Sequence, residues 1–594
     1  HTRSSWVTGF RRVLFRSDIR DLFYGSCKVN PDTVAFYVKR KHGEPFVPIT
    51  YMQMCRDMEA LGTAMLARGY GDKKIAVIGE NSYEWVLVYM AVVCGLGVMV
   101  PIDRDLQAGE VANLLERSGV SAVFYSGKKG KLLSDSLDIL RGNEDLQLPD
   151  AIVIDPVVSG EDIDEPGASF VSEEGGDIEA STLSALVREG RQMLAQGQKA
   201  YLDLSIDPKE LCVILYTSGT MGMAKGVMLG HQQIVANVYN MSKRVNVCEG
   251  GIGLSILPMH HAYEMTCHIM TILYQGRSVA IAESLKTVQD NMKEIKPTVI
   301  LGVPLIFESM LKKIYKNAQA KGRFDSLRSA IILSRKLKLY NKPAVTSRMF
   351  AEIHDAFGGN IKQLISGGAA INPSVIMDFE AMGFPMMQGY GMTECAPIIA
   401  VNRDRYSKAE SVGPPMPGTD VKILSPDEFG VGEVICKGPS VMLGYYNDPE
   451  ETERTIVNGW LHTGDYGYID KEGYIYLMGR KKNVIITRNG KNVFPEEIEY
   501  YLMRNEFISE ALVHGAPDSR TGDIIVKADI VPNLPAVYDR LGENVKAEQL
   551  HDLIQTEIEH VNDIMPSYKR VKRFSIREKE FDKTTTHKIK RKQS

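Results

Sequence analysis

The sequence has few cysteines and lacks the cysteine patterns of a metal site. Its 594 residues include eight cysteines, and no two of them form a C-x-x-C pair. Scattered cysteines without a histidine cluster at ligand spacing do not indicate a structural zinc site. We therefore expect reduced thiols, most of them buried, in a cytoplasmic protein. The cysteines are Cys27, Cys55, Cys94, Cys212, Cys248, Cys267, Cys395 and Cys436.

An excess of charge of either sign is also missing. The chain has 70 Lys and Arg against 74 Asp and Glu, a net charge of -4. Hydrophobic residues at 44% and charged residues at 24% are ordinary for a globular protein. Nothing in this balance indicates a nucleic-acid partner, and we expect none. The length exceeds the size at which one hydrophobic core stops growing, so at least two domains are expected.

Long hydrophobic runs are scarce, and one stretch approaches the length of a membrane span. Trp85–Ile102, "WVLVYMAVVCGLGVMVPI", has 18 residues without a charge, the lower limit for a span. Two glycines divide it. We favour a buried helix that ends near Cys94, a glycine turn, and a strand over 98–103. Asn81 and Glu84 are expected to cap that helix.

The first 17 residues, "HTRSSWVTGFRRVLFRS", lack an initial methionine, any acidic side chain, and an apolar core for a secretory signal. Their arginine-rich composition is similar to that of a transit peptide. We prefer to interpret 1–17 as an extraneous or disordered segment and begin the fold analysis at Asp18.

The rest of the chain alternates between two hydrophobic periods. Short β-branched runs alternate with longer stretches of helical period such as 51–70, and no internal repeat is present. This alternation predicts an α/β protein with largely parallel, buried sheets. Residues 142–181 are acidic and glycine-rich, which indicates a surface insertion. The predicted strands are 74–79, 121–126, 151–155 and 211–219.

A second, smaller domain is expected near the C-terminus. In "GRKKNVIITRNGKNVFPEEIEYYL", basic and turn residues precede Pro495, Glu496 and Glu497. Proline at the first helical position and acids in the first turn favour a helix start. A small α/β domain would follow.

The segment 216–229, "YTSGTMGMAKGVML", combines hydroxyl side chains, glycines and one lysine after an apolar strand. It is not a Walker A loop, because Ala224 precedes Lys225 and Gly226 follows it. The composition still suits phosphate, because backbone N–H groups, hydroxyls and a lysine all donate to anionic oxygens. Taken alone, the segment fits a polar turn equally well.

The other motifs decide between these readings. The loop resembles the nucleotide loop [ST]-S-G-[ST]-[ST]-G-x-P-K-G of the AMP-forming adenylate enzymes, the ANL superfamily. "LPMHHAYE", "SGGAAI", "QGYGMTE", "WLHTGD", "GRKKNVI" and "KTTTHKIKR" follow in family order over about Asp18 to Arg591. Within the family, the chain looks most similar to bacterial long-chain fatty-acid CoA ligases, the acyl-CoA synthetases.

The resemblance implies a large N-terminal AMP-binding domain with an acyl pocket over 18–478, a hinge over 479–482, and a mobile C-terminal domain over 483–594. It also implies ATP, Mg²⁺, CoA and a fatty acid. A carboxylate would attack the α-phosphate of ATP, pyrophosphate would leave, and the thiol of CoA would attack the acyl adenylate.

Most of the implied nucleotide contacts fall in three motifs. The β- and γ-phosphates of ATP would be held by Thr217, Ser218, Gly219, Thr220, Gly222 and Lys225. The adenine would lie beside Gly367, Gly368, Ala369 and Ala370. In the segment Gln388, Gly389, Tyr390 and Gly391, the tyrosine would stack on the base. Thr393 would bond the α-phosphate, and Glu394 would hold Mg²⁺.

Five further residues have implied roles. Asp465 would accept both ribose hydroxyls, since a carboxylate can take two donors. Arg480 would contact the ribose and a phosphate, and Lys482 occupies the hinge position. Lys588 would be the catalytic lysine that bridges the carboxylate and the α-phosphate. His261 would gate the acyl pocket and assist thioester formation, although a structural histidine at a strand end is the alternative.

The chain departs from the family pattern at several positions. Met221 stands where a hydroxyl residue is usual, and Ala224 where proline is usual. Gly230 precedes His231 where serine or threonine is common, and His587 replaces a glycine. These changes affect the expected rate more than the expected reaction.

Rival functions remain open at this point. "SILPMHHAYEM" has no aspartate to bind an amino group, which disfavours an amino-acid adenylation domain. The other rival functions are those of a luciferase-like oxygenase, a ligase that transfers the acyl group to a carrier protein, an impaired nucleotide-binding protein, and a membrane-associated scaffold. The last rests on Trp85–Ile102 and on the basic, apolar Ser334–Lys342, a stretch that would also let a soluble enzyme meet membrane-borne fatty acids.

Overall fold

The computed structural model describes residues 18–143, 146–157, 181–217, 224–403, 407–486, 491–518, 523–583, 589 and 591. Residues 1–17 and most of the predicted insertion therefore lie outside the described residues. The chain divides into two compact units, which we describe one at a time. The first contains His1–Asp420 and Cys436–Leu461, and the second contains Val421–Ile435 and His462–Ser594.

The first unit contains two eight-stranded sheets, and one of them is built from the predicted strands. Its order is β18-β9-β8-β4-β3-β5-β6-β7. The pairs from β8 to β7 are parallel, and β8–β9 and β9–β18 are antiparallel. The strands are β3 (Lys73–Ile78), β4 (Gly97–Ile102), β5 (Ala122–Ser126), β6 (Asp150–Ile154), β7 (Ser181–Thr182), β8 (Leu211–Thr217), β9 (Lys225–Gly230) and β18 (Gly444–Tyr445). Residues 150–154 of the predicted insertion thus belong to the sheet, because "AIVI" pairs with β5.

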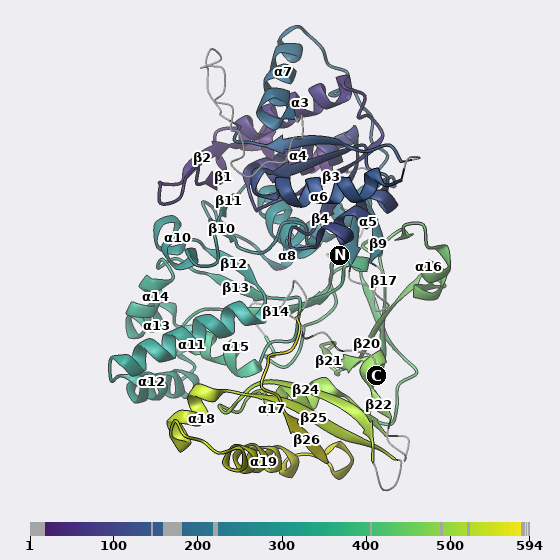
Figure 1. Ribbon diagram of the computed structural model, residues 1–594. Coiled ribbons are helices and arrows are strands. Elements are labelled where there is room, and N and C mark those ends of the chain that lie inside the picture. The colour runs from purple at the N-terminus through teal and green to yellow at the C-terminus, as the bar shows by residue number, and fades with distance from the viewer. Residues whose placement is uncertain are drawn as a thin grey trace, which may run out of the picture. The chain divides into compact units, whose positions relative to one another are not determined.

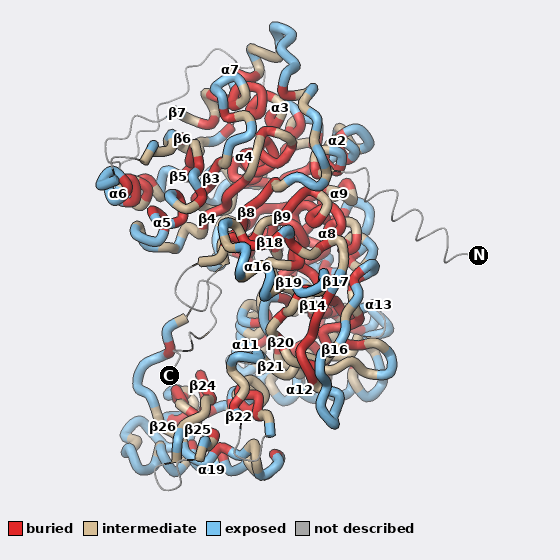
Figure 2. Tube along the Cα trace, turned by 90° about the vertical axis from the view of Figure 1, so that its right-hand side faces the viewer, coloured by how far each residue is buried: buried red, intermediate tan, exposed pale blue. Residues whose placement is uncertain are grey.

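Helices cover both faces of this sheet (Figure 2). On one face, α5 (Ala108–Ser118) and α6 (Gly130–Arg141) place leucine and valine side chains against β3, β4 and β5. On the other lie α3 (Tyr51–Ala67), α4 (Tyr83–Ala91) and α7 (Leu183–Ala195), of which α3 packs on both of the others. Burial on both faces explains the continuous apolar strands, as expected for a parallel sheet.

The charge-free run forms a buried helix and a strand, as predicted. It continues from α4 through a π-helix, Val92–Leu96, into β4. The predicted cap is wrong, because the Ser82 side chain accepts from the N–H of Trp85. Asn81 instead donates to the carbonyl of Leu257 and accepts from the N–H of Met259. Over the described residues, no helix is both long enough and apolar enough to cross a bilayer.

The second sheet has the order β15-β14-β13-β12-β10-β11-β1-β2 (Figure 1). It is parallel except at its two edges, β14–β15 and β1–β2. The strands are β1 (Val34–Val38), β2 (Val47–Thr50), β10 (Ile252–Ser255), β11 (Ser278–Ile281), β12 (Val299–Gly302), β13 (Gln363–Ser366), β14 (Met386–Gly391) and β15 (Ile398–Val401).

One face of this sheet carries a helical layer with a shared apolar core. The layer consists of α10 (Val288–Ile295), α11 (Pro304–Ala320), α12 (Phe324–Lys336), α13 (Pro343–Met349), α14 (Ala351–Ala356) and α15 (Pro373–Ala381). Three further helical segments, α8 (His231–Arg244), the π-helix η3 (Tyr263–Met270) and α9 (Thr271–Tyr274), pack together, and η3 contacts β10.

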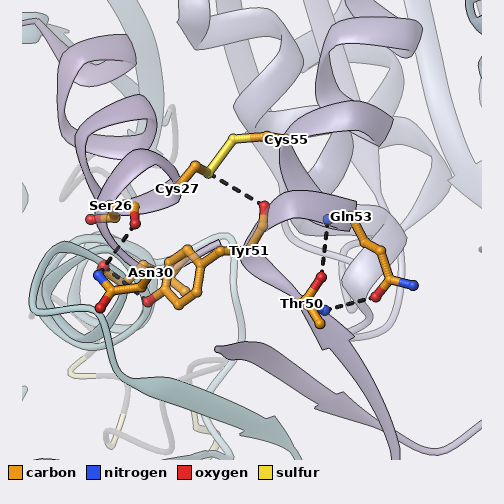
Figure 3. The surroundings of a disulfide bond; sticks show 8 residues. Ser26, Cys27, Asn30, Thr50, Tyr51, Gln53 and Cys55 are labelled. Atoms are coloured by element: carbon orange, nitrogen blue, oxygen red, sulfur yellow. Dashed lines mark hydrogen bonds between the residues drawn. A yellow bond between two sulfur atoms is a disulfide. The ribbon is translucent and has the colours of Figure 1, made fainter. Parts of the chain in front are cut away.

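The interpretation of all eight cysteines as reduced thiols is wrong for one pair. Cys27 on α2 (Ile19–Val29) and Cys55 on α3 form a disulfide, with their Cα atoms 6.8 Å apart (Figure 3). No spacing rule indicates this pair, because packing of α2 on α3 brings the two residues together. The other six are free, and all but Cys248 are buried.

In the second unit, an antiparallel hairpin precedes a small α/β layer. The hairpin is β20 (Trp460–Ile469) with β21 (Ile475–Arg480). A three-stranded sheet of β24 (Ile508–Pro517), β25 (Ile524–Pro532) and β26 (Arg573–Ile576) shares a core with three helices. These are α17 (Pro495–Leu502), α18 (Leu534–Leu541) and α19 (Ala547–Asp563). Helix α17 begins at Pro495, as predicted, with Glu496 and Glu497 in its first turn.

The remaining short strands are β16 (Asp420–Leu424), β17 (Gly432–Lys437), β19 (Ile456–Val457), β22 (Ile485–Ile486) and β23 (Asn492–Val493).

Candidate nucleotide-binding site

The predicted phosphate loop connects two paired strands. Thr217 ends β8, Lys225 begins β9, and the two residues are register partners. Ser218, Gly219, Thr220, Met221 and Gly222 lie outside the described residues. The carbonyl of Ala224 accepts a hydrogen bond of 2.8 Å from Arg117. Arg117 therefore fixes the loop end at a position where the family usually has proline.

The departure at Gly230 also has a structural reason. A Cβ at this position would lie 2.7 Å from the carbonyl oxygen of Glu210 and 2.8 Å from Oε1 of Gln233. The Gln233 side chain accepts from the N–H of Gly230, which satisfies the backbone donor of the residue that precedes helix α8.

Lys225 is held by two residues that the sequence analysis missed. Its Nζ lies 2.5 Å from Oε1 of Glu451 and 5.1 Å from the ring centroid of Tyr445. Glu451 stands in the first turn of α16 (Pro449–Thr455), and Asp448 caps that helix. Strand β18, which contains Tyr445, pairs directly with β9. Both residues lie in the segment "GYYNDPEET". The sequence feature that could have drawn attention to it is a helix start, with proline followed by two acidic residues.

Tyr445 links the lysine to the predicted metal ligand. Its hydroxyl donates to Oε1 of Glu394 over 2.9 Å. Burial, together with the nearby Glu394 carboxylate, raises the pKa of Tyr445, so the phenol stays protonated and remains a donor. Lys225 and Glu394, which are 169 positions apart by residue number, therefore lie at one place in the first unit.

Glu394 and Thr393 occupy a 3₁₀ turn, Thr393–Cys395, just after β14. Strand β14 contains Gln388, Gly389, Tyr390 and Gly391. Gln388 is buried and donates to the carbonyl of Ala409, so its amide has a structural bond. A Cβ on Gly391 would lie 2.1 Å from the carbonyl oxygen of Pro397. The Tyr390 side chain is buried at 7% exposure.

The predicted adenine loop follows the neighbouring strand. Strand β13 is parallel to β14, with Ser366 opposite Gln388, so "SGGAA" and "MTE" leave the sheet at the same edge. The carboxyl edge of a parallel sheet is where ligands usually bind. Gly367 is buried against the ring of Tyr263. Gly368, with a φ of 81°, is exposed together with Ala369 and Ala370, which leaves room for a flat base.

His261 lies beside a small apolar cavity in the first unit. It precedes η3, and its ring centroid is 4.0 Å from that of His260. The cavity volume is about 10 Å³, space for about one water. Apolar side chains such as Leu215, Ile234 and Met265 line it. Asn81 fixes the approach to this segment through Leu257 and Met259.

In the second unit, Asp465 and Arg480 are register partners on β20 and β21. Nε of Arg480 lies 2.9 Å from Oδ1 of Asp465, and Nη1 of Arg480 donates to the carbonyl of Thr463. Lys482 is exposed in a 3₁₀ turn, Lys481–Asn483. The structure thus brings Asp465 and Arg480 together.

The predicted catalytic lysine, Lys588, lies outside the described residues, as does His587. Lys583 and Ile589 form an antiparallel bridge. Arg591 is fixed by Glu499, 2.5 Å away, and by the carbonyl of Val513.

Glu394 fits Mg²⁺ as one carboxylate ligand. Over the described residues, no group of three or more His, Cys, Asp or Glu could hold a metal. Mg²⁺ typically takes one or two protein carboxylates and completes its shell with water and substrate phosphates. A nucleotide would supply the missing oxygen ligands here.

Comparison with known proteins agrees with this geometry. The human protein long-chain-fatty-acid–CoA ligase 1 is 28% identical over 504 residues, covering 80% of this chain and 69% of its own. An Arabidopsis thaliana protein, the chloroplastic long-chain-fatty-acid–[acyl-carrier-protein] ligase AEE15, is 26% identical over 620 residues, covering 91% and 79%. The solved structure of the anthranilate CoA ligase AuaEII with anthranoyl-AMP has a TM-score of 0.74 at 19% identity, covering 97% of this chain and 96% of that one.

At that identity the solved structure shows the fold alone, which confirms the predicted α/β class. The model of the AMP-binding enzyme family matches residues 23–446, and that of the AMP-binding enzyme C-terminal domain matches residues 482–594. Together these matches cover most of the motifs from which the resemblance was drawn, while "WLHTGD" at 460–465 and the start of "GRKKNVI" at 479 lie between the two matched ranges. The chain belongs to the AMP-binding enzyme family.

Proposed function

We propose that this chain is an ATP-dependent ligase that activates a long-chain fatty acid as its acyl adenylate and transfers the acyl group to CoA. The observation that carries the proposal is the position of Lys225 beside Tyr445 and Glu394. A phosphate-binding lysine and a magnesium-binding carboxylate must lie close together to hold one nucleotide. The names of the relatives supply the substrate class.

In this proposal Lys225 exchanges Glu451 for the β- and γ-phosphates, together with Thr217 and the loop hydroxyls. Thr393 donates to the α-phosphate, and Glu394 holds Mg²⁺, which neutralises phosphate charge when bound. The exposed Gly368, Ala369 and Ala370 receive the adenine. Asp465 accepts from the ribose hydroxyls, with Arg480 fixing its carboxylate.

Lys588 contacts the carboxylate and the α-phosphate while charge develops on their oxygens, and His261 borders the acyl pocket. We retain the domain boundaries expected from the sequence: an N-terminal domain over 18–478, a hinge at 479–482 that includes Lys482, and a C-terminal domain over 483–594. We also retain a cytoplasmic location.

The acceptor has a specific alternative, because one relative is named an acyl-carrier-protein ligase. The test incubates the protein with ATP, Mg²⁺ and acids from acetate to oleate, with CoA or with a phosphopantetheinylated carrier protein. AMP and the acyl products are measured by mass spectrometry. The proposal predicts acyl-CoA and AMP in equal amounts, best from laurate to oleate. Acylated carrier protein without acyl-CoA would favour the alternative.

Two lysine variants sharpen this experiment. Lys588→Ala should reduce AMP formation about 10² to 10³-fold, the usual value of one oxyanion contact. Lys579→Ala, an exposed lysine in the same unit, is the matched control and should have no effect. Tight ATP binding without AMP from any acid would instead indicate an impaired nucleotide-binding protein, to which Met221 and His587 would contribute.

A further inference from the structure

Three consecutive elements of the first unit expose apolar side chains. They are α12, the 3₁₀ turn η4 (Leu339–Asn341) and α13, and the turn contacts both helices. The most exposed of their large apolar side chains is Leu337, at 59%. We call the set the α12–α13 surface: Ile332, Leu333, Lys336, Leu337, Lys338, Tyr340, Lys342, Val345, Arg348 and Met349, all of them exposed.

Helix α12 has apolar side chains on the side that normally carries polar ones. Ile332, Leu333 and Leu337 are exposed, with Lys336 between them. The opposite face holds the helix to the unit: Ser334 donates to the carbonyl of Ala381, and Arg335 pairs with Asp378. A helix on a globular surface usually shows water a polar face. The exposed leucines are therefore not needed for packing.

The charge of this segment is one-sided. From 326 to 351 the sequence has no acidic residue and six basic ones, in a chain with a net charge of -4. The six are Arg328, Arg335, Lys336, Lys338, Lys342 and Arg348. Within the part of the chain that the structure describes, Arg335 is the one of the six that forms an ion pair, with Asp378, and Lys336, Lys338, Lys342 and Arg348 are exposed. The surface thus combines unneutralised positive charge with apolar side chains.

We propose that the α12–α13 surface docks on an anionic lipid bilayer. Leucine, valine, methionine and tyrosine side chains would enter the interface between headgroups and acyl chains. The lysines and Arg348 would reach anionic headgroups while their apolar stems lie along the interface. Each lysine or arginine near an anionic membrane surface adds electrostatic attraction, which a neutral bilayer does not provide. This proposal does not depend on the ligase activity.

The experiment measures binding of the full chain to vesicles by flotation. Phosphatidylcholine vesicles with and without phosphatidylglycerol are compared, because only the vesicles that contain phosphatidylglycerol carry net negative charge. The wild type should bind the anionic vesicles much more tightly, and binding should weaken as salt screens the charges. Equal binding to both kinds, or no binding to either, overturns the proposal.

Two double variants separate the charged and apolar contributions. Lys336→Gln with Lys338→Gln should weaken binding to anionic vesicles about 30-fold, as expected for two basic residues. Leu333→Ser with Leu337→Ser should weaken it about 10-fold or more. The controls are Lys128→Gln with Lys131→Gln, two exposed lysines elsewhere, and Leu285→Ser, an exposed leucine. If the control variants lost as much vesicle binding as the test variants, the assignment of binding to this surface would be contradicted.

Soluble competitors identify what the surface recognises. Glycerol phosphate, the headgroup chemistry without acyl chains, should not displace the protein from vesicles. Displacement by glycerol phosphate alone would indicate a site for a small anion rather than a bilayer and would overturn the proposal. Each variant should unfold at the same midpoint temperature as the wild type, which shows that a loss of binding reflects lost contacts and not misfolding.

Discussion

Nζ of Lys225 lies 2.5 Å from Oε1 of Glu451, so the lysine that should bind nucleotide phosphate already has an anionic partner. Both side chains are partly exposed, at 31% and 26%, and such pairs contribute only about 0.2 to 1 kcal/mol. A triphosphate with Mg²⁺ offers more negative charge than one carboxylate. In the proposed site, nucleotide binding therefore requires Lys225 to exchange Glu451 for phosphate, at a small cost in free energy.

Glu451→Gln should tighten ATP binding, because the competing carboxylate is gone. From the strength of a partly exposed ion pair, we expect a dissociation constant up to about 5-fold lower. Titration calorimetry without fatty acid measures it. Glu450→Gln, on the same helix but 84% exposed, is the control. Weaker ATP binding in Glu451→Gln would show that the carboxylate positions Lys225 rather than competes for it.

Tyr445→Phe should raise the Mg²⁺ concentration needed for activity. The hydroxyl donates to the Glu394 carboxylate, and losing a hydrogen bond that orients a metal ligand typically costs 10-fold or more in metal affinity. The rate of AMP formation is measured against Mg²⁺ at saturating ATP. Tyr446→Phe, the next residue, should leave the Mg²⁺ dependence unchanged. The same dependence in Tyr445→Phe and wild type would exclude this role for Tyr445.

Asp465→Asn should remove discrimination between ATP and 2′-deoxy-ATP. In the proposed site the carboxylate accepts from both ribose hydroxyls, and a hydrogen bond to a charged group contributes about 1.5–3 kcal/mol. The wild type should therefore prefer ATP by roughly 10-fold or more in kcat/KM, and the variant should use both nucleotides almost equally. An unchanged preference in the variant would place the ribose elsewhere.

The buried side chain of His231 should make the free energy of unfolding fall in acid. Burial, with Arg20 nearby, lowers the pKa of this side chain to about 4 from its usual 6.5. Because the folded pKa is the lower one, its contribution to stability is complete above pH 6.5 and is lost as pH falls through about 4. The difference corresponds to about 3 kcal/mol in the free energy of unfolding.

Urea unfolding of wild type and His231→Gln between pH 7 and pH 4 tests this contribution. The wild type should lose about 3 kcal/mol more than the variant over that interval. His551→Gln, an exposed histidine at 53%, should follow the wild type. Equal pH dependence of wild type and His231→Gln would rule out the buried neutral imidazole.

Much of this fold is predictable because its signals are local. "AVFYS" is buried over its first four residues and "AIVI" is buried or half-buried, so both strands are largely apolar and the runs are visible in the sequence. Pro495 with two acids marks a helix start without any tertiary information. The nucleotide motifs were recognisable because they are short and contiguous.

What the sequence did not indicate depends on contacts between distant segments. Glu451 and Tyr445 reach the site only because β18 pairs with β9, more than two hundred residues earlier. Cys27 and Cys55 meet through helix packing. Asn81 looked like a helix cap, but adjacent Ser82 has the geometry to bond the N–H of Trp85, which leaves Asn81 for Leu257 and Met259.

Transfer of oxygen from fatty acid to AMP tests the central claim most directly. The protein is incubated with ATP, Mg²⁺, CoA and oleate labelled with ¹⁸O in both carboxylate oxygens. One carboxylate oxygen bonds the α-phosphorus as pyrophosphate leaves, and the CoA thiol then attacks the acyl carbon and releases AMP with that oxygen. We predict AMP with one ¹⁸O for each acyl-CoA formed. Unlabelled AMP, or ADP in its place, would contradict an acyl-adenylate mechanism.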